Sequence, residues 1–259
     1  MTILNKAVML SCSAISSFSL WANEIQQESE SEFNLSGNIG LTSKYISRGL
    51  TNSPENDDLA IQGGLTLNYN NFYASYWGST LGYSYAALQG EPSRRIDKFE
   101  HDFILGYNFN TENLSGSLWN ATYYYPGGTK TTSNEMGLTI SHQFNPKTSL
   151  STQVSTYLYD VVYANQGDTY VSLGLNYEIN EKLSSNTLIS GNYFNDDGRY
   201  EGNELGDTQR NYAFRFASTG LSYLLSPELS VSAQYILGGY NRYDEKQRNA
   251  TVFSMNYSF

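Results

Sequence analysis

Apolar and polar side chains alternate with a period of two along the last ten residues of the chain, 250–259. Phe253, Met255, Tyr257 and Phe259 fall on one face of an extended strand, and smaller, mostly polar side chains fall on the other. Successive side chains of a strand point to opposite faces, so this pattern predicts a strand with one apolar face. The last strand of a closed barrel pairs with the first, whereas an exposed edge strand invites pairing with other chains. The segment therefore favours a barrel over its alternative, an edge strand of a secreted β-sandwich.

Similar alternation recurs along the chain between clusters of turn-forming residues. It predicts twelve strands at 33–47, 59–69, 72–82, 98–109, 114–125, 134–144, 149–159, 169–179, 183–194, 210–225, 229–238 and 250–259. The connections between them are long and short in turn, and all five prolines fall in connections, as ladder hydrogen bonding requires. About ten tilted residues per strand suffice to cross an outer membrane. We therefore expect an all-β fold, an antiparallel transmembrane β-barrel with short periplasmic turns and longer external loops.

The first 22 residues have the features of a signal peptide. Lys6 supplies a positive charge, an apolar run follows over 7–20, and Leu20-Trp21-Ala22 offers a cleavage site. Cys12 is too close to Lys6 for a lipoprotein signal to be favoured. Residues 23–32 are polar and acidic, which predicts a disordered periplasmic segment. The domain organisation expected is therefore a signal peptide at 1–22, this segment at 23–32 and the barrel at 33–259.

Composition fits this interpretation and excludes one class of partner. Charged residues make up 15% of the chain and mean hydropathy is −0.46, as expected when only every second residue faces lipid. Removing Lys6 with the leader leaves 14 basic and 25 acidic residues, a formal charge of 14 − 25 = −11. A chain this acidic has no basic stripe to neutralise phosphates, which argues against nucleic acid as a partner.

Several short motifs resemble the TorF-type porin family in their order and spacing. They are Tyr45-Ile46-Ser47-Arg48-Gly49, Ala60-Ile61-Gln62-Gly63-Gly64, Phe72-Tyr73-Ala74, Trp77-Gly78-Ser79, Gly106-Tyr107, Tyr123-Tyr124-Tyr125-Pro126-Gly127, and Glu135 with Gly137. The resemblance covers roughly Asn34 to Ser141 and implies a bacterial outer-membrane barrel, but it adds little about substrate. The longer loop 83–97 departs from the family pattern. The terminal Met255, Tyr257 and Phe259 also resemble the signal that the barrel-assembly machinery recognises in such proteins.

The polar side of the alternation predicts which side chains face the lumen. This set comprises Asn38, Lys44, Gln62, Asn68, Glu100, Asp102, Glu135, Gln143, Gln153, Asn176, Glu178, Arg215, Gln234 and Asn256. With Arg48 at the rim, these residues form either a wet, mildly acidic conduit or a polar network that plugs a narrow barrel.

Within that set, four acids and two bases leave an excess of two negative charges, which predicts mild cation preference. The acids are Glu100, Asp102, Glu135 and Glu178, and the bases are Lys44 and Arg215. We expect Glu135 to contribute most, unless it pairs with Arg48 and serves only to hold the barrel together.

Other candidate chemistry receives less support. His101 and His142 have no serine beside them on the same face, so a lipid-hydrolysing site is not expected. Gly198 and Glu204 have the spacing of a calcium loop, but the first ligand position would be Tyr193, so we expect a solvated acidic loop and no metal or cofactor. Aromatic residues near strand ends suggest interface girdles, and some suit carbohydrate stacking. These are Trp77, Trp119, Tyr123, Tyr124, Tyr125, Tyr212, Phe214, Tyr257 and Phe259.

The sequence thus predicts a non-enzymatic outer-membrane channel for passive diffusion of small solutes, exported through the periplasm and surrounded by outer-membrane lipid and lipopolysaccharide. The alternative is a closed barrel with a structural or surface-interaction role.

Overall fold

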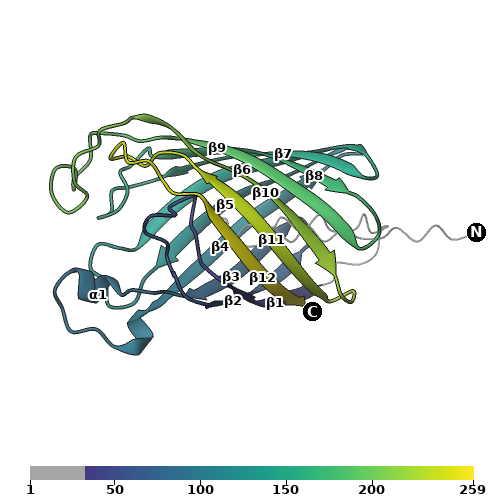
Figure 1. Ribbon diagram of the computed structural model, residues 1–259, viewed down its shortest axis with the longest axis horizontal. Helices are drawn as coiled ribbons and strands as arrows, with labels where there is room; N and C mark the ends of the chain where they lie inside the picture. The colour runs from purple at the N-terminus through teal and green to yellow at the C-terminus, as the bar shows by residue number, and fades with distance from the viewer. Residues whose placement is uncertain (1–32) are drawn as a thin grey trace, which may run out of the picture.

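The computed structural model describes residues 33–259, so the expected signal peptide at 1–22 and the segment at 23–32 lie outside the described residues. Twelve antiparallel strands form a closed barrel in which each strand pairs with the next and β12 pairs with β1 (Figure 1). The strands are β1 Phe33–Thr42, β2 Ala60–Tyr69, β3 Phe72–Thr80, β4 Phe99–Asn110, β5 Leu114–Tyr124, β6 Ser133–Asn145, β7 Thr148–Tyr157, β8 Thr169–Glu178, β9 Leu183–Tyr193, β10 Tyr212–Leu224, β11 Leu229–Gly238 and β12 Ala250–Ser258.

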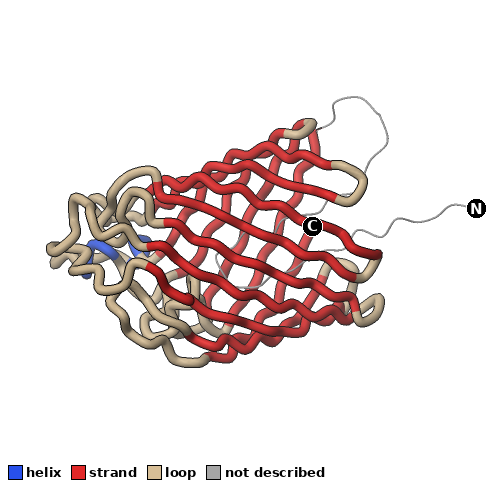
Figure 2. Tube along the Cα trace, turned by 90° about the horizontal axis from the view of Figure 1, so that it is seen from above, coloured by secondary structure: helices blue, strands red, loops and turns tan. Residues whose placement is uncertain are grey.

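The predicted fold class and strand order are confirmed. The long connections gather at one end of the barrel, the long-loop end, and the short turns and the C-terminus lie at the other, the short-turn end (Figure 2). Closure is made by the segment where the alternation is cleanest: Ile39 pairs with Tyr257, and Gly37 and Phe259 exchange two backbone hydrogen bonds of 2.8 and 2.9 Å.

The outer face of the wall is apolar. Leu35 and Leu105 are each 66% exposed and Phe253 is 60% exposed, whereas inward-facing neighbours such as Ile104 and Val252 are at most 4% exposed. A surface of this size is stable only against an apolar solvent such as lipid. Among the described residues, no helix is long and apolar enough to cross a membrane.

The first strand is shorter than predicted. β1 ends at Thr42, and residues 43–59, here called the inner loop, leave the wall and fold into the lumen. Tyr45, predicted on the apolar outer face, is instead 2% exposed and packs against Trp77 with ring centroids 5.7 Å apart. Farther along, Arg48 and Gly49 have φ angles of 45° and 74°, which a strand does not adopt, so the chain turns sharply at the tip of the loop.

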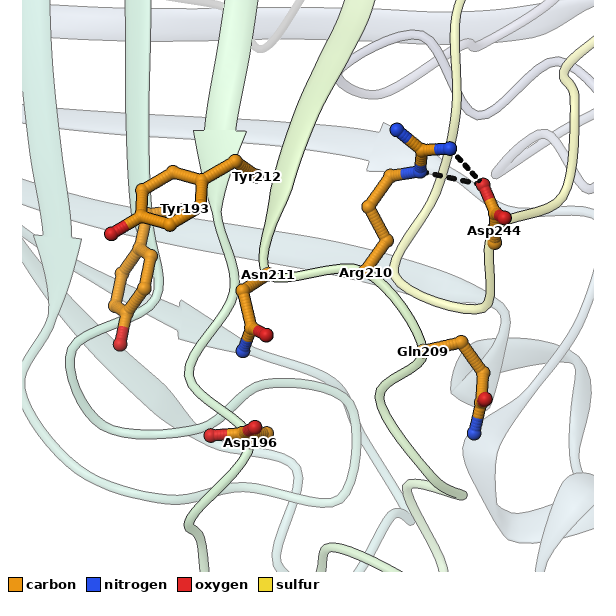
Figure 3. A pocket seen from close by; sticks show the side chains of 7 residues that line it. All are labelled: Tyr193, Asp196, Gln209, Arg210, Asn211, Tyr212 and Asp244. Atoms are coloured by element: carbon orange, nitrogen blue, oxygen red, sulfur yellow. Dashed lines mark hydrogen bonds and ion pairs between the residues drawn. The ribbon is translucent and has the colours of Figure 1, made fainter.

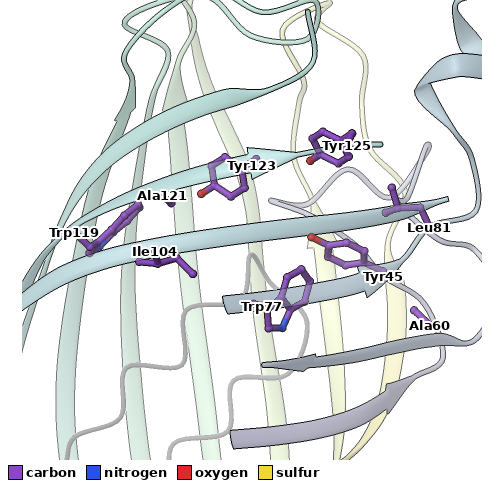
Figure 4. Packing of buried hydrophobic residues seen from close by; sticks show 9 residues of the cluster. All are labelled: Tyr45, Ala60, Trp77, Leu81, Ile104, Trp119, Ala121, Tyr123 and Tyr125. Carbon is purple, nitrogen blue, oxygen red and sulfur yellow. The ribbon is translucent and has the colours of Figure 1, made fainter. Parts of the chain in front are cut away.

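Several aromatic residues predicted in the interface girdles also face inward. Trp77, Trp119, Tyr123 and Tyr125 are buried in one cluster with Tyr45 at the long-loop end of the lumen (Figure 4). Tyr124, Tyr212, Phe214, Tyr257 and Phe259 do face outward. The short helix α1, Tyr85–Leu88, lies in a long loop and packs against this cluster, with the Tyr85 and Tyr125 ring centroids 4.8 Å apart.

A bulge in β10 places two consecutive side chains inside the barrel. Opposite β9, the register shifts between Phe214 and Phe216, so Arg215 is an extra residue. Arg215 and Phe216 are therefore both buried, at 3% and 0% exposure. This irregularity brings a charge and an aromatic ring to the same point of the lumen.

Candidate functional site

The inner loop is anchored inside the lumen by a buried ion pair. Nη2 of Arg48 lies 2.8 Å from Oε1 and 2.6 Å from Oε2 of Glu135 on β6. The Glu135 side chain has no exposed surface, that of Arg48 is 13% exposed, and the Tyr123 hydroxyl donates to Glu135 Oε2 at 2.7 Å. Burial lowers the pKa of Arg48, but the charge of Glu135 outweighs this and the net pKa is raised. Both oxygens of Glu135 thus have a donor within hydrogen-bond distance, as a buried carboxylate requires.

The tip of the inner loop is held from other sides as well. The Arg48 guanidinium lies over the rings of Tyr157 and Tyr170, 5.7 and 4.8 Å from their centroids. Nη2 of Arg215 donates to the Arg48 carbonyl oxygen at 2.9 Å. Gly49 lies so close to Phe216 that a Cβ would come within 2.5 Å of the ring. The tip thus contacts β7, β8 and β10 in addition to β6, which places it within the lumen.

One wall of the lumen is acidic. Glu100 and Asp102 on β4 are 4% and 5% exposed, and Glu55 reaches them from the inner loop. Glu100 Oε1 accepts from the Tyr125 hydroxyl at 2.7 Å, and Glu55 accepts from the Tyr83 hydroxyl. Glu100 Oε2 and Asp102 Oδ1 have no hydrogen-bond partner within the described chain. Burial, and then the charge of Glu100, raises the pKa of Glu55 to about 8.

The opposite wall carries arginines. β10 stands six strands from β4 in either direction around the closed order of twelve, so Arg215 faces the acidic wall across the lumen. Arg242, in the loop before β12, pairs with Asp168 at 3.1 Å, both side chains being at most 6% exposed. Arg242 and Arg215 are thus occupied, Arg242 by a carboxylate and Arg215 by carbonyl oxygens of Arg48 and Tyr240.

The structure brings most of the charged lumen candidates together but not all. Glu100, Asp102, Glu135 and Arg215 lie on the inward face of the wall. Glu178 shares the inward face of β8 at the short-turn end, away from this group.

Lys44 is not on the lumen wall, which corrects its sequence assignment. The strand alternation that placed Lys44 inward stops at Thr42, and Lys44 instead pairs with Asp57 within the inner loop with its side chain 39% exposed. Sequence reasoning also missed Glu55, Asp168 and Arg242, which come from long loops where periodicity gives no orientation.

The remaining candidates are accounted for by contacts with neighbouring residues. His101 Nδ1 lies 2.9 Å from the Tyr76 hydroxyl, and the His142 ring packs on Phe144 at 4.7 Å. In the acidic loop 194–211, Glu201 accepts from Asn165 at 2.6 Å and Glu204 pairs with Lys130 at 3.3 Å. Within residues 33–259, no group of three or more His, Cys, Asp or Glu side chains is placed to hold a metal ion.

Residues 26–256 match the model of a family described as "Bacterial protein of unknown function (Gcw_chp)". The chain belongs to the Gcw_chp family. The family model thus covers the barrel except for its last three residues, whereas the TorF-type name suggested by the motifs stays a prediction. No curated protein sequence matches the chain.

Solved structures with a similar fold include porins. The KdgM porin is 10% identical, with a TM-score of 0.56, and the match covers 86% of this chain and 99% of that one. The NanC porin is 14% identical, with a TM-score of 0.51 and coverage of 87% and 99%. A second KdgM structure, "in complex with disordered oligogalacturonate", is 8% identical, with a TM-score of 0.51 and coverage of 87% and 98%. At these identities the likeness shows the fold, a closed barrel of porin type.

Proposed function

We propose that this chain is a bacterial outer-membrane channel, exported by its signal peptide, through which small solutes diffuse passively. The observation that carries the proposal is a closed wall with an apolar outer face and a lumen lined by polar and charged side chains. A barrel of this kind is suited to lipid outside and water inside. The porin fold of KdgM and NanC supports the same conclusion. Binding and transport alone, without catalysis, are proposed.

We propose that the inner loop limits the size of the solutes that can pass. It occupies part of the lumen at the long-loop end, where Tyr45 and Ile46 are at most 2% exposed. Solutes would pass beside this loop and between the acidic and arginine-bearing walls, so the channel is one for small molecules and ions.

We further propose weak cation preference, carried by Glu100 and Asp102 rather than by Glu135. Glu135 is neutralised by Arg48, and the arginines of the opposite wall are occupied. Glu100 and Asp102, by contrast, each have one buried oxygen without a hydrogen-bond partner in residues 33–259. Charges along a low-dielectric wall focus the field that an ion meets, so this surplus attracts cations.

Planar-bilayer recording tests both parts of this proposal. We expect discrete conductance steps and a reversal potential of cationic sign in a salt gradient. Combining Glu100→Gln with Asp102→Asn should move that potential toward zero, while Glu112→Gln, in an exposed turn outside the lumen, should not. Anion preference in the unmodified protein would contradict the proposed selectivity.

The second candidate is a closed barrel with a structural or surface-interaction role. The way the inner loop is anchored favours this role, because its partner Glu135 is fully buried inside the lumen. An Arg48→Met variant separates the two functions, because it releases the principal anchor of the loop. If neither the unmodified barrel nor this variant conducts, the structural role is supported and the channel is not.

Assembly in the membrane is part of the proposal. Met255, Tyr257 and Phe259 face outward from the last strand, between 42% and 64% exposed. We propose that this stripe is read by the barrel-assembly machinery and afterwards contacts outer-membrane lipid and lipopolysaccharide.

A further inference from the structure

A pocket of about 600 Å³ opens at the long-loop end, outside the lumen described above (Figure 3). It is formed where β9 ends and β10 begins, together with Asp196 from the loop between them and Asp244 from the loop before β12. Its volume is in the range of small-ligand sites. None of its side chains takes part in the acidic wall or in the anchoring of the inner loop.

Two tyrosine rings form one side of the pocket. Tyr193 and Tyr212 are directly paired across β9 and β10, with ring centroids 5.1 Å apart and planes inclined by 44°. Tyr212 is 75% exposed, more than any other large apolar or aromatic side chain in the described chain. An exposed aromatic face offers a stacking surface for a ligand that is apolar on one side and polar at its edges.

The polar side chains of Asn211, Gln209 and Asp196 also line the pocket (Figure 3). The amides of Asn211 and Gln209 contribute both donors and acceptors, and the carboxylate of Asp196 contributes acceptors. Hydroxyl groups donate and accept at once, so a ligand rich in hydroxyls can satisfy both kinds of partner.

The charge of the pocket selects against anions. The Arg210 guanidinium is held by Asp244 at 2.5 Å and lies 4.6 Å from the centroid of the Tyr240 ring. With Asp196 and Asp244 against Arg210, the formal charge is one positive minus two negative, or −1. A phosphate or an acidic sugar would therefore meet net repulsion.

The base of the pocket is fixed before any ligand arrives. The Phe194 amide donates to the Asn211 carbonyl at 2.7 Å, and the Asn211 side chain donates back to the Phe194 carbonyl at 3.0 Å. The amides of Gln209 and Arg210 both donate to the Arg242 carbonyl, at 2.8 and 3.0 Å. Arg242 is itself held by the buried Asp168. Binding to such a preorganised frame loses little conformational entropy.

We propose that this pocket binds an uncharged saccharide ring, stacked on Tyr212 and hydrogen-bonded through its hydroxyls to Asn211 and Asp196. This goes beyond the proposed channel function, since binding at the outer mouth needs no conduction. The sugar could come from the saccharide portion of lipopolysaccharide beside the barrel or from free saccharide in the medium. The competing account is that Tyr193 and Tyr212 only anchor the barrel at the lipid interface.

Saturation-transfer NMR and calorimetry on the refolded barrel in detergent micelles test the site. The probes are methyl glucoside, N-acetylglucosamine, maltotriose, a deacylated lipopolysaccharide core oligosaccharide, and galacturonate as an anionic comparison. We expect the uncharged sugars to bind at least tenfold more tightly than galacturonate. Tighter binding of the core oligosaccharide than of maltotriose would assign the site to lipopolysaccharide, and the reverse order to free saccharide.

Three variants make the test specific to the pocket. Tyr212→Ala should weaken sugar binding at least tenfold, and Tyr212→Phe, which keeps the ring, should weaken it less than threefold. Tyr124→Ala is the matched control, because Tyr124 is an outward, 43% exposed tyrosine at the long-loop end of β5. Absence of sugar binding to a barrel shown to be folded by its gel mobility would overturn the proposal. Equal losses in Tyr212→Ala and Tyr124→Ala, or equal affinity for galacturonate, would also overturn it.

Discussion

The Glu135→Gln substitution tests whether the buried ion pair serves to hold the inner loop. Glutamine keeps one acceptor oxygen, which can serve the Tyr123 hydroxyl, but it removes the charge opposite Arg48 and replaces the second oxygen by an NH2 group. Breaking a buried pair by removing one partner costs about 3–5 kcal/mol. Since the Arg48 side chain keeps 13% of its surface exposed, water recovers part of this, and we expect the lower end of the range. A loss of about 3 kcal/mol corresponds to about two powers of ten in the unfolding equilibrium.

Urea unfolding of the refolded protein in lipid vesicles measures this loss. Fluorescence of Trp77 is a suitable signal because its ring touches Tyr45 of the inner loop. Arg48→Met combined with Glu135→Gln should be more stable than Glu135→Gln alone, because no uncompensated charge is then left buried. Bilayer reversal potentials of the single variant should be unchanged. If Glu135→Gln loses less than about 1 kcal/mol, the value of an exposed pair, and also shifts the reversal potential, Glu135 lies on a wet path and our reasoning is wrong.

Three further predictions concern other parts of the barrel. The pKa of Glu55 is higher in the folded chain, at about 8, than its ordinary value of 4.5, so the folded state binds this proton more tightly than the unfolded state does. The free energy of unfolding should therefore fall as pH rises from about 4.5 to 8. Urea midpoints of the Glu55→Gln variant should lack this pH-dependent fall. Gly49→Ala should cost about 1–3 kcal/mol from strain and contact with Phe216, more than Gly167→Ala, where φ is also positive, at 87°, but nothing lies within 4 Å. Deleting Phe259 should lower the outer-membrane level measured by cell fractionation without blocking export, and normal assembly would remove its role as a signal.

The sequence is informative wherever one face of a strand meets lipid. Alternation alone places β11 at its observed bounds and most other strands within one or two residues, because a shift of one residue would expose every apolar side chain to the lumen. The inward position of Glu100, Asp102 and Arg215 follows from the same periodicity. The β-bulge at Arg215, however, cannot be predicted from that periodicity.

Long-range packing inside the lumen leaves no such signal. Ser43, Tyr45 and Ser47 continue the alternation of β1, so periodicity extends that strand into what is the inner loop. Trp77 and Trp119 occupy strand positions where either face would accept an aromatic ring, and only packing against the inner loop and across the lumen decides between them. The pairing of Arg48 with Glu135 joins residues 87 apart in sequence, so the sequence offers it only as an alternative to an unpaired Glu135 and no local pattern decides between the two.

The spread of the inner-loop contacts along the chain has a consequence for the order of assembly. The loop follows the first strand, yet its partners are synthesised far later: Arg215 is 167 residues from Arg48, and Gln247 is 195 residues from Asn52. Contacts of such high sequence separation cost loop-closure entropy before they stabilise the fold. In a barrel that lacks its last strands, the loop therefore makes only part of its contacts. Arg48 pairs with Glu135, but the Arg48 carbonyl lacks its hydrogen bond from Arg215. The inner loop can therefore make its full set of contacts only when β10 and the loop before β12 are in place.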